Sequence, residues 1–258
     1  FLALALVAVE AGVNTTVTSV TTTSREAYTR DNKEVQALME KLEPAEDFYR
    51  VEKKTRKTKN DGAWMNFPSV SLFSSTANAD LTKFFKRMGC EASTNAYSIT
   101  GSTPLVDSLL SVRYALYSEY IPNTDLVNYI QESGGTYLYE NLYTLPLGFV
   151  LPYDLADNWQ YQMENPAEVQ NDLCLLLGTD DVLVPVETEV SGSGCTFTAD
   201  MAGEYYVYIQ NKKVKNVKAS LPSGEKNFSN VDRGYLLEMG NLSEGSRITL
   251  TPGESGET

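Results

Sequence analysis

The stretch that decides the fold runs from Asn66 to Tyr117: NFPSVSLFSSTANADLTKFFKRMGC (66–90), EASTNAYSITGST (91–103) and PLVDSLLSVRYALY (104–117). A turn rich in Ser, Thr and Asn leads into an amphipathic helix over residues 77–88. One face of this helix is apolar and consists of Leu81, Phe84, Phe85 and Met88. The helix ends at Gly89, because glycine adopts a positive φ at little cost.

A second helix is predicted over residues 104–110, with Thr103 as its N-cap and Pro104 at its first position. It leads directly into a strand at Val112–Tyr117. Two apolar helices followed by an apolar strand indicate the core of an α/β layer.

Composition limits the class of protein. With 258 residues, of which 42% are hydrophobic, the chain is long enough for two domains with buried cores. The net charge of −13 excludes nucleic acid as the expected partner, since phosphate binding needs clustered Lys and Arg. The absence of histidine removes Ser–His and Cys–His catalytic pairs and histidine metal sites. We expect buried free thiols at Cys90, Cys174 and Cys195, although one pair could bond in an oxidising compartment.

The remaining elements of the first half follow from periodicity. Residues 14–24 are predicted to be a linker or an extended edge, and Arg25–Leu42 a surface helix that Pro44 ends. A possible helix is predicted over residues 125–131. Four strands would form a mixed sheet, one face of which the helices 77–88 and 104–110 would cover: 48–53, 112–117, 136–140 and 147–151.

The second half has a different pattern. Asn165 and Pro166 begin a helix that Gly178 ends, and Glu168 completes a pattern resembling a capping box. From Val182 onward, short alternating runs separated by Gly- and Ser-rich turns predict an antiparallel β-sandwich. The predicted fold class is therefore α+β, with an N-terminal α/β domain followed by the sandwich.

The run PSVSLFSSTANADLTKFFKRMG (68–89) followed by VDSLLSVRYAL (106–116) resembles the large extracytoplasmic portion of the YfhO family. The resemblance recurs at FYRVE (48–52), ENLYTLPLGFVLP (140–152) and NPAEVQNDLCLLLG (165–178), so it covers residues 44–178. YfhO proteins are bacterial polytopic membrane proteins, regarded as GT-C-type glycosyltransferases linked to sugar decoration of lipoteichoic acid.

The resemblance implies a location on the extracytoplasmic face of the bacterial cell membrane, no cofactor within these residues and a polyprenyl-phosphate sugar donor for the full-length protein. The implied partners are the protein's own membrane domain and a cell-envelope glycopolymer of the teichoic-acid type. The opening run FLALALVAV (1–9) is either a buried helix or expression remnant, or the outer end of a transmembrane helix. The expected organisation is a transmembrane remnant and linker (1–24), an α/β domain (25–164), a connecting helix (165–178) and the sandwich (179–258).

A basic segment, KKTRKTK, follows the first predicted strand and carries Lys53, Lys54, Arg56, Lys57 and Lys59. One interpretation is the solvated end of a hairpin, closed by the turn Asn60-Asp61-Gly62. The other is a contact with anionic lipid head groups or a polyanionic acceptor, to which each cation near the surface contributes about 1 kcal/mol.

A group of polar residues falls at predicted strand and helix ends inside the family-like motifs: Arg50, Ser74, Ser75, Asn78, Asp107 and Arg113. One interpretation is an ion-paired junction with helix caps. The other is a ligand-binding pocket, in which two arginines beside hydroxyl and amide donors would suit a phosphate or sugar hydroxyls.

Other candidates are weaker. Asp180-Asp181 is interpreted as a turn after a helix, and no catalytic residue is assigned. Trp64 and Trp159 either stack on sugar rings or lie at the edge of the core. Three hypotheses remain open: the noncatalytic region of a membrane glycosyltransferase holding an acceptor, a carbohydrate-binding module that uses the tyrosines of the sandwich, and a structural spacer.

Overall fold

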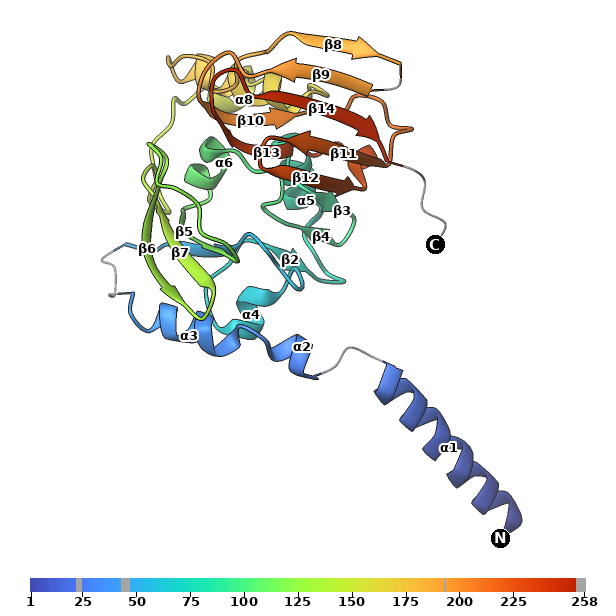
Figure 1. The fold of residues 1–258 in the computed structure, drawn as a ribbon. Helices are drawn as coiled ribbons and strands as arrows, with labels where there is room; N and C mark the ends of the chain where they lie inside the picture. Colours follow the sequence, from blue (N-terminus) through green and yellow to red (C-terminus); the bar gives the residue numbers. More distant parts are fainter. Residues whose placement is uncertain (22–24, 43–46, 193, 254–258) are drawn as a thin grey trace.

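The structure is a computed structural model that describes residues 1–21, 25–42, 47–192 and 194–253. It is an α+β protein, which confirms the predicted fold class. Figure 1 shows the C-terminal strands above a four-stranded sheet, with the first helix extending away from both. Pro44, the predicted end of the helix over Arg25–Leu42, and part of the predicted linker lie outside the described residues.

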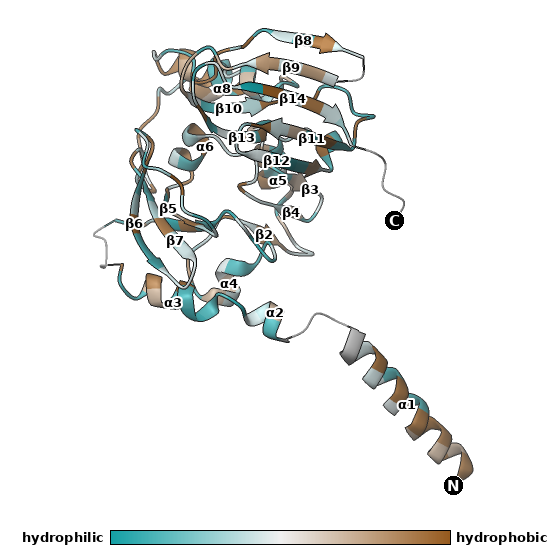
Figure 2. Ribbon diagram, in the orientation of Figure 1, coloured by the Kyte–Doolittle hydropathy of each residue, from teal (hydrophilic) through white to brown (hydrophobic). Residues whose placement is uncertain are grey.

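The N-terminal helices differ from the prediction. Helix α1 (Leu2–Thr21) continues through residues expected to be linker or extended chain, and its described side chains are exposed, which excludes a buried helix. Figure 2 shows how apolar α1 is along its first turns. The single helix expected over 25–42 is instead two, α2 (Arg25–Thr29) and α3 (Asn32–Met39), because Asp31 between them has a φ of 66°.

The N-terminal sheet is mixed, as predicted, and has the strand order β1-β5-β7-β6. Strand β1 runs parallel to β5, and the other neighbours are antiparallel. Val35 and Leu38 of α3 pack with Val51, Leu116 and Leu138 into one buried cluster beneath the sheet. The strands are β1 (Arg50–Lys53), β5 (Val112–Tyr117), β6 (Val127–Ser133) and β7 (Thr136–Asn141).

Two predicted elements of this sheet are wrong. Residues 125–131 do not form a helix, because Val127–Ser133 pairs with β7 through a two-glycine hairpin turn at Gly134 and Gly135. Residues 147–151 do not form a strand and lie in an exposed connection. The flanking Pro146 and Pro152 lack the N–H donors of a strand ladder, and Gly148 lacks a side chain to pack.

The stretch that decides the fold forms the elements expected of it. In helix α5 (Ala79–Arg87) the Asn78 side chain accepts hydrogen bonds from two backbone amides, and Gly89 follows the helix with a φ of 80°. Thr103 caps α6 (Pro104–Leu109), which leads into β5. The shorter elements around them are α4 (Asp61–Met65), β2 (Leu72–Phe73), β3 (Ala92–Ser93) and β4 (Ala96–Tyr97).

Helix α5 is placed differently from the prediction. It packs on β3, β4 and α8 (Pro166–Leu176), whereas α3 and α4 lie against the four-stranded sheet and α6 contacts β5. Phe85 stacks on Tyr97 at 4.4 Å between ring centroids and shares a cluster with Val106 and Val169. Phe85 and Met88 of the apolar face are therefore buried against a small three-stranded sheet, β2-β4-β3, that sequence periodicity did not reveal, whereas Leu81 is exposed.

The connecting helix is confirmed in detail. Asn165 caps α8 and also donates to Glu168, while Thr179 and Gly178 donate back to carbonyls of the last turn. This is the paired hydrogen-bond pattern of a glycine-terminated helix. A short helix, α7 (Leu155–Asn158), precedes it.

The C-terminal half consists of antiparallel sheets, as predicted. A five-stranded sheet, β12-β11-β14-β9-β8, and a two-stranded sheet, β10-β13, share one buried cluster that includes Phe197, Ile248, Tyr205 and Leu237. Strand β12 was missed, because its polar sequence GEKNFS resembles a loop. The elements are β8 (Thr188–Ser191), β9 (Gly194–Thr198), β10 (Gly203–Val207), β11 (Asn216–Leu221), β12 (Gly224–Ser229), η1 (Val231–Arg233), β13 (Leu237–Leu242) and β14 (Arg247–Pro252).

Main-chain amides donate hydrogen bonds across the boundary between the two halves. The Leu236 amide donates to the Gly89 carbonyl at 2.8 Å, and the Gly101 amide donates to Glu238 at 3.1 Å. Gly101 has a φ of 83°, and a Cβ atom there would lie 2.5 Å from the Gly89 carbonyl oxygen and 2.6 Å from that of Leu236. The halves therefore approach more closely than any side chain at position 101 permits.

Candidate functional site

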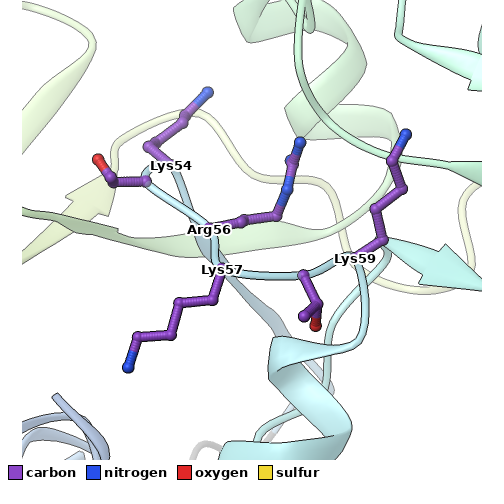
Figure 3. Close-up of a pocket in the computed structure, with 6 residues that line it drawn as sticks. Lys54, Arg56, Lys57 and Lys59 are labelled. Atoms are coloured by element: carbon purple, nitrogen blue, oxygen red, sulfur yellow. The ribbon is translucent and has the colours of Figure 1, made fainter. Parts of the chain in front are cut away.

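The basic segment is not the tip of a hairpin. It connects β1 to α4, and its side chains reach acidic residues of this chain in several directions. Figure 3 shows Lys54, Arg56 and Lys59 on one side of the segment and Lys57 on the other. Lys53 and Lys57 contact Asp31 at 3.3 and 3.8 Å. Much of the positive charge that the sequence concentrates here is therefore offset within the fold.

Glu91 pairs with two cations of the basic segment and with one cation of the C-terminal half. Its carboxylate lies 2.9 Å from Lys59, 3.7 Å from Arg56 and 3.7 Å from Arg233 of the sandwich, and it also accepts a hydrogen bond from Ser98. Burial alone would raise the pKa of Glu91, but the hydrogen bonds and charges of Lys59, Ser98 and Arg56 outweigh it, so the pKa is lowered. Glu91 is therefore a carboxylate paired with three cations, and these ion pairs hold three segments together.

Lys54 has the opposite surroundings. Its ammonium group lies 3.5 Å from Asp107 and 3.9 Å from Glu238, so it joins β1 to α6 and to the sandwich strand β13. Burial opposes the charged form, but the two carboxylates outweigh it and raise the pKa of Lys54 well above its ordinary value. Lys54 is therefore charged at neutral pH, at the boundary between the two halves.

A cavity of about 80 Å³ opens beside Lys54, and we call it the junction pocket. Within the described part of the chain, two buried polar atoms in its wall have no hydrogen-bond partner: the Ser102 hydroxyl and Oδ1 of Asp107. Buried polar groups are normally satisfied, so unsatisfied ones in a cavity wall mark where a ligand or water can bind. The residues that line the pocket are Lys54, Ser102, Pro104, Asp107, Tyr117, Ile121, Leu126, Val127, Asn141, Tyr143, Glu204, Tyr206 and Glu238.

The ionisable groups of the junction pocket respond to burial and to one another. Burial raises the pKa of Glu204, against the hydrogen bond from Asn241, and nearby Glu238 raises it further. Burial likewise raises the pKa of Tyr117 to about 12 and that of Tyr206 well above its ordinary value. Both tyrosines therefore keep their hydroxyl protons at neutral pH, so each can donate a hydrogen bond as well as accept one.

The predicted polar group is not brought together. Arg50 donates to the Leu110 carbonyl at 2.7 Å, and Arg113 pairs with Glu140 at 2.9 Å. Ser74 and Asn78 bond to backbone amides of their own turn and helix, and Ser75 is exposed. Asp107 alone of the six lines the junction pocket, where it meets Lys54 of the basic segment.

The remaining candidates are also placed. Trp159 donates its indole N–H to the Val169 carbonyl at 2.9 Å and packs against the core, whereas Trp64 is half-exposed and packs on Tyr28. Asp180-Asp181 is exposed in the connection between α8 and β8. All three cysteines are free thiols; Cys90 and Cys174 are buried, and Cys195 is partly buried. Among the described residues, no group of three or more Cys, Asp or Glu side chains is arranged to hold a metal ion.

Sequence reasoning missed most of the junction pocket, including Ser102, Glu204, Tyr206 and Glu238. One signal was available: Glu238 lies between Leu237 and Met239, which are both buried in the sandwich core. Alternation places Glu238 on the opposite face of the strand, which would ordinarily face water. That the first half covers this face could not be read from the pattern.

The fold and the site together define an α+β protein with a polar pocket between its two halves. The model of a family described as "Bacterial membrane protein YfhO" matches residues 1–189, and the chain therefore belongs to this family of bacterial membrane proteins. The resemblance stated from its motifs is thus confirmed. The comparison with curated proteins and the comparison with solved structures each found no match. Among the described residues, no helix meets the length and hydropathy required of a membrane span.

Proposed function

We propose that these residues form an extracytoplasmic region of a YfhO membrane protein and hold a cell-envelope glycopolymer acceptor of the teichoic-acid type. Sugar transfer from a polyprenyl-phosphate donor would take place in the membrane part of the protein. The observation that carries the proposal is the junction pocket, in which buried hydroxyl, carboxylate and ammonium groups converge, two of them with an atom that lacks an internal partner.

The chemistry of the pocket suits hydroxyl groups of a sugar or polyol. The Ser102 hydroxyl can donate to and accept from a ligand hydroxyl, and Asp107 Oδ1 can accept from one. Tyr117, Tyr143 and Tyr206 add aromatic surface and further hydroxyls. Such a pocket recognises a hydroxyl-rich ligand by hydrogen bonds and fixes its orientation.

The charge balance of the pocket selects the part of the ligand that enters. One ammonium group, from Lys54, faces the carboxylates of Asp107, Glu204 and Glu238. A phosphate at the centre of this group would be repelled, because negative charge already exceeds positive charge there. The proposal is therefore that sugar or polyol hydroxyls occupy the pocket while the phosphates of a teichoic-acid chain stay outside it.

Titration calorimetry of the whole chain with purified lipoteichoic acid tests binding. We expect Ser102→Ala to weaken the affinity about tenfold, since it removes a hydrogen bond to the ligand without leaving an internal partner unpaired. Ser75→Ala is the matched control, because Ser75 is exposed and lies outside the pocket, and it should bind like the unmodified chain. Equal binding by both variants would place the ligand elsewhere, and no binding by the unmodified chain would refute the proposal.

A second experiment tests the biological role. In a bacterium that lacks its own copy of the full-length protein, the unmodified gene should restore sugar on lipoteichoic acid, measured by mass spectrometry. The Ser102→Ala gene should restore less at equal protein abundance, and the Ser75→Ala gene should restore all of it. Full restoration by the Ser102→Ala gene would show that sugar transfer does not need the Ser102 hydroxyl of the junction pocket.

A further inference from the structure

The connection between β7 and α7 exposes an unusual amount of apolar surface. Residues 141–153, NLYTLPLGFVLPY, contain no charged side chain, although the chain as a whole carries a net charge of −13. Val150 is 98% exposed and Tyr153 fully exposed. The exposed large hydrophobic residues here, which we call the apolar loop, are Leu142, Tyr143, Leu147, Phe149, Val150, Leu151 and Tyr153.

The apolar loop is anchored at both ends. The Leu142 amide donates to the Leu126 carbonyl at 2.9 Å, and the Leu145 amide donates to the Ser108 carbonyl at 3.3 Å. At the other end, the Leu155 amide donates to the Pro152 carbonyl at 3.2 Å, and the Leu155 side chain is buried. Both ends of the loop are therefore held to the rest of the fold, and the residues between them are exposed.

The arrangement within the apolar loop resembles that of segments at a membrane–water interface. Tyr143 and Tyr153 bracket the aliphatic and phenylalanine side chains, and tyrosine concentrates at the level of the lipid head groups. Contiguous exposed apolar surface of this kind marks an interaction site. A charge-free segment also avoids the repulsion that the rest of an acidic chain experiences from anionic lipids.

The backbone of the apolar loop limits its depth. Pro146, Gly148 and Pro152 prevent regular secondary structure, so its amide and carbonyl groups need water or head-group partners. The loop therefore suits the interfacial region of a bilayer and not the hydrocarbon centre. Members of the family are bacterial membrane proteins, so a bilayer is available for the loop to contact.

We propose that the apolar loop inserts its tip, residues 147–151, into the lipid interface of the membrane in which the protein resides. This inference does not depend on the ligand of the junction pocket. It does have a consequence for that pocket, because Tyr143 at the base of the loop also lines it. Lipid contact by the loop would place one wall of the junction pocket beside the membrane surface.

A fluorescent label at position 150 tests the proposal in the whole chain. Val150→Cys in a Cys195→Ser background would carry an environment-sensitive dye, and the probe is phosphatidylcholine vesicles with and without spin-labelled lipid. We expect the emission to shift to the blue and to be quenched by spin-labelled lipid. The matched control is Val184→Cys with the same dye, since Val184 is 69% exposed in the connection before β8 and should show neither effect.

The dye reports only on the surroundings of position 150, so adsorption of the apolar helix α1 to the vesicles does not by itself produce the signal. Replacing both Leu147 and Phe149 with Ser should reduce quenching at position 150 about tenfold or more, because their transfer from water drives insertion. No quenching at 150 while the chain is bound to vesicles would overturn the proposal. A blue shift in the full-length membrane protein without quenching by lipid would show that a protein surface covers the loop, which would also overturn it.

Discussion

The two ends of the basic segment meet acidic residues in opposite proportions. At one end, Glu91 is a single carboxylate surrounded by Lys59, Arg56 and Arg233. At the other end, Lys54 is a single ammonium group facing Asp107 and Glu238, beside a cavity with two unsatisfied polar atoms. Both ends tie the first half of the chain to the sandwich, but the buried Ser102 and Asp107 atoms without a hydrogen-bond partner lie at the Lys54 end.

This difference distinguishes a structural cluster from a candidate binding site. Where internal partners already engage a charged group, as three cations and Ser98 engage Glu91, a ligand gains little by entering. Where buried groups remain unsatisfied beside a cavity, a ligand recovers part of the free energy spent on burying them. Both ends carry conspicuous charge, so charge alone would not have told them apart.

Among the tests of this comparison, Lys54→Met is expected to change the stability of the protein most. It keeps most of the side-chain volume but leaves Asp107 and Glu238 without their cation, and we expect it to lower the free energy of unfolding by about 4 kcal/mol. Urea denaturation at neutral pH measures the change. Adding Asp107→Asn to this variant should recover part of the loss, because it removes one of the unpaired charges. A change below about 1 kcal/mol would mean that water already solvates this end of the segment.

Gly101→Ala tests how closely the two halves approach. Gly135 is the matched control, because it has the same φ of 83° but no atom within 4 Å of an added Cβ. Each substitution incurs the backbone penalty of about 1 kcal/mol. Only Gly101→Ala adds a clash with two carbonyl oxygens, so it should destabilise by about 2 kcal/mol more in the same denaturation assay. Equal effects would show that the halves separate easily.

Glu91→Gln should cost about 1 to 2 kcal/mol at neutral pH, because three cations lose their shared carboxylate. The pKa of Glu91 is lowered in the folded protein, so its contribution is present above the unfolded pKa and is lost as the pH falls through the folded pKa. The difference in unfolding free energy between the two proteins should therefore be constant near neutrality and disappear below the ordinary carboxylate pKa of 4.5. A difference that persists in acid would have to come from packing.

The smallest effect is expected from Lys218→Gln. Lys218 lies 2.8 Å from Glu225 across strands β11 and β12, but the two side chains are 43% and 58% exposed. Solvent-exposed ion pairs contribute little to stability, so the free energy of unfolding should change by less than about 0.5 kcal/mol, and the change should vanish at high salt. A loss as large as that of Glu91→Gln would show that distance, and not burial, determines the worth of an ion pair in this protein.

Local sequence signals predicted local structure well. The caps at Thr103 and Asn165, the strand Val112–Tyr117 and the stop at Gly178 were all readable, because capping and alternation depend on neighbouring residues. The errors arose where tertiary pairing decided the outcome. Val127–Ser133 is a strand because β7 lies beside it, and the polar strand β12 exists because β11 does.

The candidate site was predicted only in part for the same reason. Asp107 and Lys54 were singled out separately, one in a polar group and the other in a basic segment, and nothing local connects them. Glu204 and Glu238 lie far along the chain from both and join them only through the docking of the β10-β13 sheet on the first half. A pattern that describes one strand at a time contains no information about which surface will cover its outer face.

The wall of the junction pocket draws on residues from Lys54 to Glu238, so it is assembled from both halves of the chain. During synthesis, the first half leaves the ribosome while two of the carboxylates that complete the wall have yet to be made. The wall of the junction pocket is therefore complete only once β10 and β13, which carry Glu204 and Glu238, have docked on the first half.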